Sequence, residues 1–277
     1  NNNWYTNTMA VWCMKYALET VENVKQAAPE LYAQLARKIT FREKDETAIW
    51  NNIIRNMYFP ANGDLGICLQ QDGYMDKEQL LVIDLPEEDR PLNQQWSWDR
   101  ILRSCFIKQA DVLQGLYFFE EQYDTDTIRR NFEFYEPRTV HESSLSPCVH
   151  AILAARLGKK QQAYEFYLRT GRLDLDDYNN DTDDGLHITS MAGTWMSIVE
   201  GFAGMRVRNG QLHFHPFLPE KWESFSFNIL FGGAALNIRI TKTGAHISRL
   251  SGKETDIYVN GQLYQSPSAR KPVIRHS

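Results

Sequence analysis

Cysteine is scarce in these 277 residues, and the four that occur stand far apart. Cys13, Cys68, Cys105 and Cys148 form no Cys-x-x-Cys pair, which excludes the common zinc and dithiol redox motifs. A disulfide framework is not expected at so low a density. We therefore expect a protein of the reducing cytoplasm without a zinc or dithiol redox site.

The chain also lacks a long apolar run and an excess of either charge. No stretch approaches the ~20 consecutive apolar residues that a membrane span requires. There are 30 Lys and Arg against 35 Asp and Glu, with no basic stripe, so neither a membrane nor nucleic acid is an expected partner. With only 16 Gly and 10 Pro and an aromatic content of 12%, collagen-like and disordered classes are excluded.

The first residues do not resemble an ordinary N-terminus. Asn1 is neither an initiator Met nor part of a signal-type segment. Apolar residues recur at helical spacing from Trp4 onward, and a helix that is apolar from its first turn normally needs preceding chain to cover it. We therefore expect the sequence to begin inside a larger polypeptide, with a disordered start as the alternative.

Up to about Phe202, the hydrophobic pattern predicts helices joined by long loops, with strand signals only at Gly66–Gln70 and Leu80–Leu85. Pro29 followed by Glu30 is a typical helix start. Helix pairs separated by long loops suit an α/α toroid, in which the loops at one end form the site. The predicted helices are Trp4–Val24, Pro29–Ile39, Lys44–Met57, Arg103–Phe119, Thr125–Phe134, Ser146–Leu157, Lys160–Leu168 and Ile188–Phe202.

After Gly204 the pattern changes to short alternating strands. Asn209-Gly210 lies between two of them and is a strong signal for a two-residue hairpin. The next predicted strands, separated by glycine-containing turns, are Phe225–Phe231, Ala235–Thr241, His246–Ser251 and Asp256–Val259. The sequence thus predicts a mainly α protein, with a helical domain at 1–204 and a small antiparallel β domain with a tail at 205–277.

One polar run combines features of a carbohydrate-binding rim. Residues Gln94–Arg100 bring two tryptophans together with amides, a carboxylate and a cation, and residues Phe106–Asp111 follow with further polar side chains. Sugars stack their C–H faces on indole rings, and their hydroxyls pair with amide and charged groups. The alternative is a packed loop in which the tryptophans belong to the core.

Two further runs contain groups that can bind an anion. Ser143 and Ser144 precede an apolar helix, where they either cap it or hold an anion together with the helix N-terminus. An acidic loop at 181–184 turns through Gly185 and brings His187 to the start of another helix, as a neutral hydrogen-bonding group or as a cation beside a phosphate. The acidic loop lacks the ligand alternation of a calcium loop.

Taken together, these runs resemble glycoside hydrolase family 65, the inverting α-glucoside phosphorylases. The loop Trp96–Ser104 is most similar to that of the maltose phosphorylases in the family. The resemblance spans nearly the whole chain and implies the second half of an (α/α)6 barrel followed by a small C-terminal β domain. The matching pieces, in the family's order, are Asn3–Asn7, Ile107–Leu113, His141–Ser146, Asp184–Ile188 and Gly201–Arg206.

The resemblance also implies a reaction, with inorganic phosphate as co-substrate and no cofactor. A general acid protonates the glycosidic oxygen while phosphate attacks the anomeric carbon from the opposite face. Maltose and phosphate would thus give β-glucose 1-phosphate and glucose. The family's acid is a Glu that falls upstream of Asn1, so no catalytic residue is expected in this chain. The chain alone is therefore expected to be inactive, with the preceding portion of the same polypeptide as a partner and a homodimer as the assembly.

The site residues implied by the resemblance fall into three groups. His187, Ser143 and Ser144 would bind phosphate, and Lys108 and Gln109 would bind the transferred glucosyl group. For the acceptor glucose subsite, our own conjecture from the residues is Trp96 and Trp98.

Three alternatives to maltose phosphorolysis remain at this stage. A trehalose, kojibiose or nigerose phosphorylase would differ only in its acceptor contacts. A hydrolase of the same fold would need a carboxylate near the phosphate pocket, and Glu142 or Asp184 is the nearby candidate. A non-catalytic carbohydrate-binding module would bind sugar without turnover.

Overall fold

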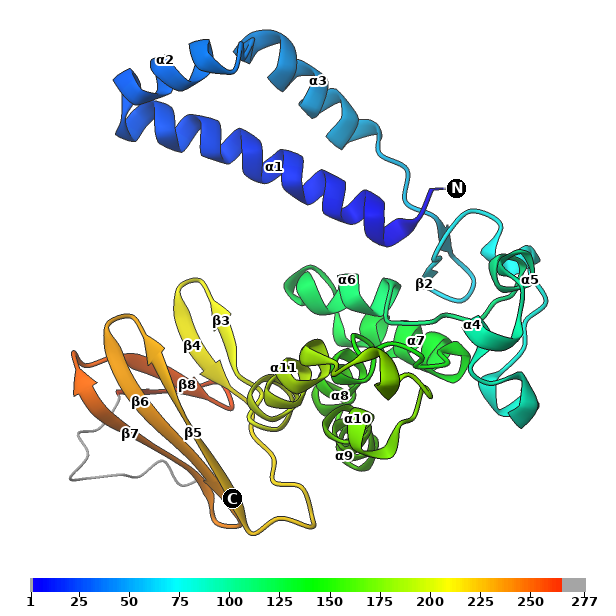
Figure 1. Ribbon diagram of the computed structural model, residues 1–277. Helices are drawn as coiled ribbons and strands as arrows, with labels where there is room; N and C mark the ends of the chain where they lie inside the picture. Colours follow the sequence, from blue (N-terminus) through cyan, green and yellow to red (C-terminus); the bar gives the residue numbers. More distant parts are fainter. Residues whose placement is uncertain (1, 266–277) are drawn as a thin grey trace. The chain divides into compact units, whose positions relative to one another are not determined.

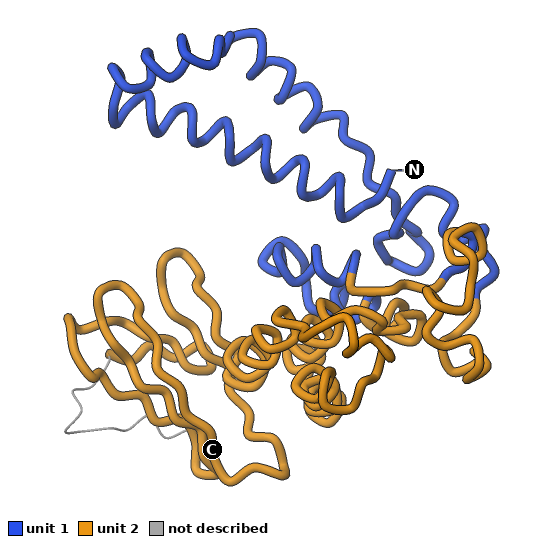
Figure 2. Tube along the Cα trace, in the orientation of Figure 1, with its two compact units in different colours: residues 1–79, 103–105, 111–131 blue, residues 80–102, 106–110, 132–277 orange. Residues whose placement is uncertain are grey.

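The computed structural model describes residues 2–265, which form parts of two compact units (Figure 2). Asn1 and residues 266–277, the tail of the predicted C-terminal domain, lie outside the described residues. Unit 1 takes Asn1–Gln79, Arg103–Cys105 and Asp111–Asn131, and unit 2 takes Leu80–Leu102, Phe106–Ala110 and Phe132–Ser277.

Unit 1 begins with three helices, as predicted (Figure 1). The Asn3 side chain caps the first by accepting from the backbone N–H of Thr6 at 2.7 Å, and Pro29 opens the second. The short strands that follow pair antiparallel, and the second is tied to Asn131, whose Oδ1 accepts from the N–H of Cys68. These elements are α1 (Trp4–Ala27), α2 (Pro29–Lys38), α3 (Glu43–Asn56), β1 (Ala61–Asn62) and β2 (Ile67–Cys68).

The predicted helix at Arg103–Phe119 is wrong. The structure has α5 (Trp98–Arg103) and α6 (Val112–Phe118) with irregular chain between them. Ile107 makes an isolated parallel bridge with Thr139, and its carbonyl accepts the N–H of Val140 at 2.9 Å. This pairing keeps the backbone extended in a segment whose apolar residues recur at helical spacing, which is why the helix prediction failed there.

The extended segment predicted at Leu80–Leu85 is also wrong. Residues Val82–Asp84 form a 3-10 turn, and the Asp84 carboxylate accepts from the N–H of Leu81 at 3.3 Å. A side chain that closes its own turn competes with an extended conformation. The 3-10 turns are η1 (Tyr74–Asp76), η2 (Val82–Asp84), η3 (Glu87–Asp89), η4 (Glu120–Gln122), η5 (Glu136–Arg138) and η6 (Thr182–Asp184).

The helical part of unit 2 is built around α8 (Pro147–Arg156), whose residues from Pro147 to Ala154 are all buried. Gly193 permits a close approach of α11, because a Cβ there would lie 2.8 Å from the Cβ of Cys148. The helix predicted at Ile188–Phe202 is present over its whole length, but its last part, Ser197–Phe202, is π-helical. The helices, including α7, which continues from unit 1, are α4 (Leu92–Gln95), α7 (Thr125–Tyr135), α9 (Lys160–Gly171), α10 (Leu173–Asp176), α11 (Ile188–Met196) and the π-helix η7 (Ser197–Phe202).

The strands of unit 2 form two sheets, in the orders β3-β4-β8-β9 and β5-β6-β7. Asn209 and Gly210 make the predicted hairpin turn. The small β domain is mostly antiparallel, as expected, with one parallel pair between β4 and β8, and β9 was not predicted. The strands are β3 (Arg206–Arg208), β4 (Gln211–Phe214), β5 (Ser224–Phe231), β6 (Ala234–Thr241), β7 (Gly244–Gly252), β8 (Asp256–Val259) and β9 (Gln262–Gln265).

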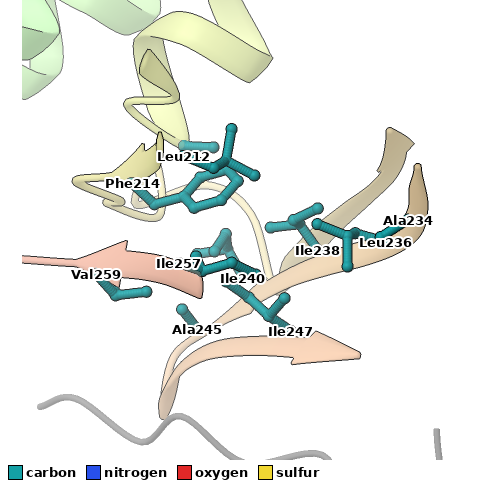
Figure 3. Packing of buried hydrophobic residues seen from close by; sticks show 11 residues of the cluster. Leu212, Phe214, Ala234, Leu236, Ile238, Ile240, Ala245, Ile247, Ile257 and Val259 are labelled. Atoms are coloured by element: carbon teal, nitrogen blue, oxygen red, sulfur yellow. The ribbon is translucent and has the colours of Figure 1, made fainter. Parts of the chain in front are cut away.

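An aliphatic core joins the two sheets (Figure 3). Leu236, Ile238, Ile247 and Ile257 are fully buried within it, and each contributes roughly 1.5–3 kcal/mol by leaving water. The fold class is confirmed as mainly helical with a small sheet domain at the C-terminal end, whereas the division into 1–204 and 205–277 stays a prediction. Among residues 2–265, no helix has both the length and the apolar character to cross a bilayer.

Candidate active site

His187 immediately precedes α11 and contacts a carboxylate on each side of its ring. Its Nδ1 lies 2.6 Å from Oδ1 of Asp174, and its backbone N–H donates to Oδ2 of the same residue at 3.0 Å. Its Nε2 lies 3.4 Å from Oδ2 of Asp181. The side chain of His187 remains 24% exposed, so an anion from solvent can reach the ring.

These contacts favour the charged form of His187. The hydrogen bond to Asp174 raises the pKa of His187, burial opposes it, and the charge of Asp181 raises it further. Partial burial raises the pKa of Asp174, but the hydrogen bonds from the His187 ring and backbone outweigh it, so this pKa is lowered. The two shifts stabilise the same pair, an imidazolium beside a carboxylate.

Ser143 and Ser144 link the turn before α8 to two other segments. The Ser143 hydroxyl donates to Oε1 of Gln109 at 2.9 Å, and the hydroxyls of Ser144 and Thr189 lie 2.5 Å apart. Thr189 stands two residues after His187, so one end of α11 is shared by the imidazole and by the partner of Ser144. The structure thus connects three runs that lie up to 80 residues apart.

The capping alternative for these serines is wrong. Helix α8 begins at Pro147 with Ser146 as its N-cap, and no side chain supplies a capping hydrogen bond there. The hydroxyls of Ser143 and Ser144 instead make the contacts to Gln109 and Thr189.

Two buried histidines support this turn from the inside. The imidazole Nδ1 of His141 lies 2.9 Å from the Ser146 hydroxyl, and Nδ1 of His150 lies 3.0 Å from the Ser146 carbonyl oxygen. The two rings meet edge to face at 4.4 Å. Burial lowers the pKa of His150 to about 4, and burial, with His150 and Arg169, lowers that of His141. Both rings are therefore neutral at neutral pH.

The two candidate bases of a hydrolase stand in different surroundings. Glu142 is buried, and its Oε1 accepts the backbone N–H of Leu92 at 2.7 Å, so this carboxylate fixes a loop. Asp184 is exposed on η6.

Lys108 and Gln109 lie on the irregular chain between α5 and α6, and both are exposed. Ile107 and Ala110 on either side are buried, so the backbone anchors this pair at both ends. Lys108 thus presents an exposed ammonium on an anchored segment.

Trp96 and Trp98 differ in exposure. Trp96 is 9% exposed, lies 5.9 Å from the Phe106 ring, and has the Arg100 guanidinium 3.6 Å from its own centroid. Trp98 is 71% exposed. The packed-loop interpretation therefore describes Trp96, and Trp98 is the one of the pair that offers an indole face to solvent.

The sequence analysis did not single out Asp174 or Thr189. Thr189 stands next to the motif residues Leu186–Ile188, which is the one signal that could have found it. Asp174 lies 13 residues before His187 in a short helix that contains one other carboxylate, Asp176, and nothing in its spacing distinguishes it. Among residues 2–265, no group of three or more His, Cys, Asp or Glu is placed to hold a metal ion.

Comparison with known families follows the same motifs. Residues 1–196 match the glycosyl hydrolase family 65 central catalytic domain, and residues 205–266 match the family's C-terminal domain. The chain belongs to glycosyl hydrolase family 65. The resemblance recognised from the sequence motifs is thereby confirmed.

Individual relatives in this family are phosphorylases with different names. The chain is 48% identical over 267 residues to a maltose phosphorylase of Bacillus subtilis, covering 96% of this chain and 34% of that protein. It is 39% identical over 258 residues to an alpha,alpha-trehalose phosphorylase of Thermoanaerobacter brockii, covering 93% and 33%. The solved structure of a "putative kojibiose phosphorylase from human microbiome" matches with a TM-score of 0.90 at 34% identity, covering 100% and 37%. The chain spans about a third of the length of the curated relatives it matches.

Proposed function

We propose that this chain forms part of an inverting glycoside phosphorylase that converts maltose and phosphate reversibly to β-glucose 1-phosphate and glucose. One observation carries the proposal: the Ser144 hydroxyl and His187, whose charged form is favoured by its carboxylate contacts, are both anchored at the start of α11. A charged imidazole and hydroxyl donors suit inorganic phosphate. The 48% identity to a maltose phosphorylase supports maltose as the disaccharide.

The proposed mechanism needs two groups, phosphate as the nucleophile and a general acid. Phosphate is already an anion, so it needs no base of the kind that activates water in an inverting hydrolase. Instead, His187, Ser143 and Ser144 hold phosphate in line with the anomeric carbon, which lowers the entropic part of the barrier. Glu142 supports this division, because its carboxylate is bound to the Leu92 backbone and not held for a water.

Exposed residues beside His187, Ser143 and Ser144, which we call the phosphate cradle, would contact the sugar. Gln109 accepts from Ser143, so the phosphate-binding turn and the amide that would bind the glucosyl hydroxyls are held together. Lys108 supplies a second donor for those hydroxyls. Trp98 would form a wall of the acceptor subsite, with Trp96 packed behind it.

The rest of the reaction belongs to the longer polypeptide in this proposal. The general acid is a Glu upstream of Asn1, the enzyme works as a cytoplasmic homodimer, and no cofactor is needed besides the phosphate co-substrate. The 277 residues alone would then be inactive.

The test is the phosphate dependence of maltose cleavage by the protein expressed at the length of its relatives. We expect β-glucose 1-phosphate and glucose in equal amounts, and no cleavage without phosphate. Release of glucose at the same rate in the absence of phosphate would identify a hydrolase instead. Trehalose, kojibiose and nigerose in parallel reactions decide the acceptor.

A further inference from the structure

Asp174 is bound to His187 more tightly than a chance neighbour would be. Both of its carboxylate oxygens are used, one by the ring Nδ1 at 2.6 Å and one by the backbone N–H at 3.0 Å. The first distance is at the short end for a charge-assisted hydrogen bond. Two contacts on one residue fix the orientation of the imidazole as well as its position.

The other charged residues around α10 pair with each other and not with Asp174, which pairs with His187. Arg172 stands two residues before Asp174, yet its guanidinium binds both carboxylate oxygens of Asp176, with Nε 2.7 Å from Oδ2. Asp174 itself is only 15% exposed at its side chain. His187 is therefore the cation that compensates this carboxylate.

The contact on the other side of the ring is looser. Asp181 Oδ2 lies 3.4 Å from Nε2, beyond the 2.7–3.2 Å range of a normal N–H···O hydrogen bond. Its side chain is 31% exposed on an acidic loop, where its backbone N–H donates to Oδ1 of Asp177 at 3.0 Å. Asp183 and Asp184 on the same loop are exposed. An oxygen anion from solvent can therefore compete for Nε2.

We propose that Asp174 is a positioning residue that orients His187 through Nδ1 and the backbone, and that Asp181 is an internal carboxylate that occupies Nε2–H until phosphate displaces it. This inference rests on the proposed function, since it assigns phosphate to His187. A carboxylate and a phosphate dianion repel each other, so the two cannot share one N–H at this range. Phosphate binding would then include the cost of displacing Asp181.

The charged groups that act on His187 come from two elements. Asp174 stands on α10 and Asp181 in the loop at the start of η6, and both favour the imidazolium. α11 contributes neutral groups, with Thr189 bound to Ser144 and Ser190 donating to the Thr170 carbonyl oxygen. α9 contributes one cation, Arg169, whose guanidinium donates toward the carbonyl oxygens of Val140 and His141 at 3.5 and 3.4 Å. Removing either carboxylate changes one identifiable contact to the ring.

The positioning part is tested by NMR of 15N-histidine-labelled chain, with the His187 signals assigned from the His187→Gln variant. We expect Asp174→Asn to lower the pKa of His187 by more than one pH unit. The matched control Asp183→Asn, an exposed carboxylate of the acidic loop, should change it far less. An unaltered His187 titration in folded Asp174→Asn would overturn the positioning role. This readout needs no turnover, so it stands or fails apart from the proposed function.

The displacement part is tested by phosphorolysis kinetics of the protein at the length of its relatives. We expect Asp181→Asn to lower KM for phosphate about 3- to 10-fold with kcat little changed, whereas Asp183→Asn should have no effect. Asp174→Asn should raise KM for phosphate and shift the pH profile toward acid. A raised or unchanged KM for phosphate in Asp181→Asn would show that Asp181 does not compete. Absence of any phosphorolysis in the unaltered protein would refute the proposed function and the displacement, and leave the NMR result valid.

Discussion

Unit 2 contains two histidine sites whose surroundings favour opposite charge states of the same side chain. His141 and His150 lie in the core, at 6% and 0% exposure, with no carboxylate contact to either ring among residues 2–265. His187 is partly exposed and has a carboxylate at each ring nitrogen. Burial lowers the pKa of the first two, and the Asp174 hydrogen bond raises that of the third. The neighbouring groups, and not the residue type, determine what each histidine can do.

The two histidine sites also have different roles in the candidate active site. The neutral pair holds Ser146 by its hydroxyl and its carbonyl, and so fixes the turn that carries Ser143 and Ser144. Asp174 holds the His187 imidazole at Nδ1, and Nε2 has the longer contact to Asp181. A rigid neutral support beside an oriented imidazole is the pre-organised arrangement that suits an anion-binding site.

The largest effect is expected from removal of His187. We expect His187→Ala to lower kcat/KM for phosphorolysis roughly 10²- to 10³-fold, because one charged donor is lost from the developing phosphate contact. Steady-state rates with maltose and phosphate measure this. His215→Ala serves as the control, since this histidine is exposed near the sheets. Near-normal rates in His187→Ala would remove His187 from the cradle.

The free energy of unfolding should depend on pH in opposite directions at the two histidine sites. His150 stays neutral in the folded protein down to a pKa of about 4, whereas the unfolded chain protonates it near 6.5. Stability from this residue is therefore complete above about pH 6.5 and lost as the pH falls to about 4, by at most about 3 kcal/mol. His187 has the opposite sign: its contribution is present below 6.5 and is lost as the pH rises through its raised pKa.

Urea unfolding at a series of pH values measures this loss. His150→Phe, which removes the titrating group, should be less stable at pH 7 and should flatten the fall between pH 6.5 and 4. An equally steep fall in that variant would assign the acid sensitivity to other groups.

How much of these sites the sequence predicts depends on how local the determining contacts are. Helices α1 to α3 and the Asn209-Gly210 hairpin follow from periodicity and turn residues, and they were predicted within a few residues. The segment around Lys108 was predicted as helix, because the bridge of Ile107 to Thr139 depends on chain 32 residues away.

The candidate site shows the same limit. Family motifs identified His187 and the serines, but the contacts of Ser143 to Gln109 and of Ser144 to Thr189 join segments 34 and 45 residues apart. The carboxylate that distinguishes His187 from the buried pair comes from Asp174, which no motif includes. The parallel pairing of β4 with β8 was missed for the same reason, since no local turn specifies it.

The neutral support is weakened by a smaller change, Ser146→Ala. This variant leaves Nδ1 of His141 without its partner in the core, and we expect a loss of about 1–3 kcal/mol in the free energy of unfolding. Because the turn with Ser143 and Ser144 loosens, KM for phosphate should rise as well. Ser226→Ala, at an exposed position of β5, is the matched control. A stability equal to that of the control would mean that the His141–Ser146 contact does not hold the turn.

The smallest effect is expected at the exposed indole. Trp98→Ala removes an aromatic face with 71% of its surface in solvent, and stacking of this kind contributes ~0.5–1.5 kcal/mol. We therefore expect KM for glucose in the synthetic direction to rise roughly 2- to 10-fold, with KM for phosphate and the free energy of unfolding unchanged. Leu102→Ala on the same helix is the control, since that side chain is 68% exposed and is assigned no ligand. If KM for phosphate rises and KM for glucose does not, Trp98 belongs to the phosphate cradle, and the separation between a charged anion site and an aromatic acceptor wall fails.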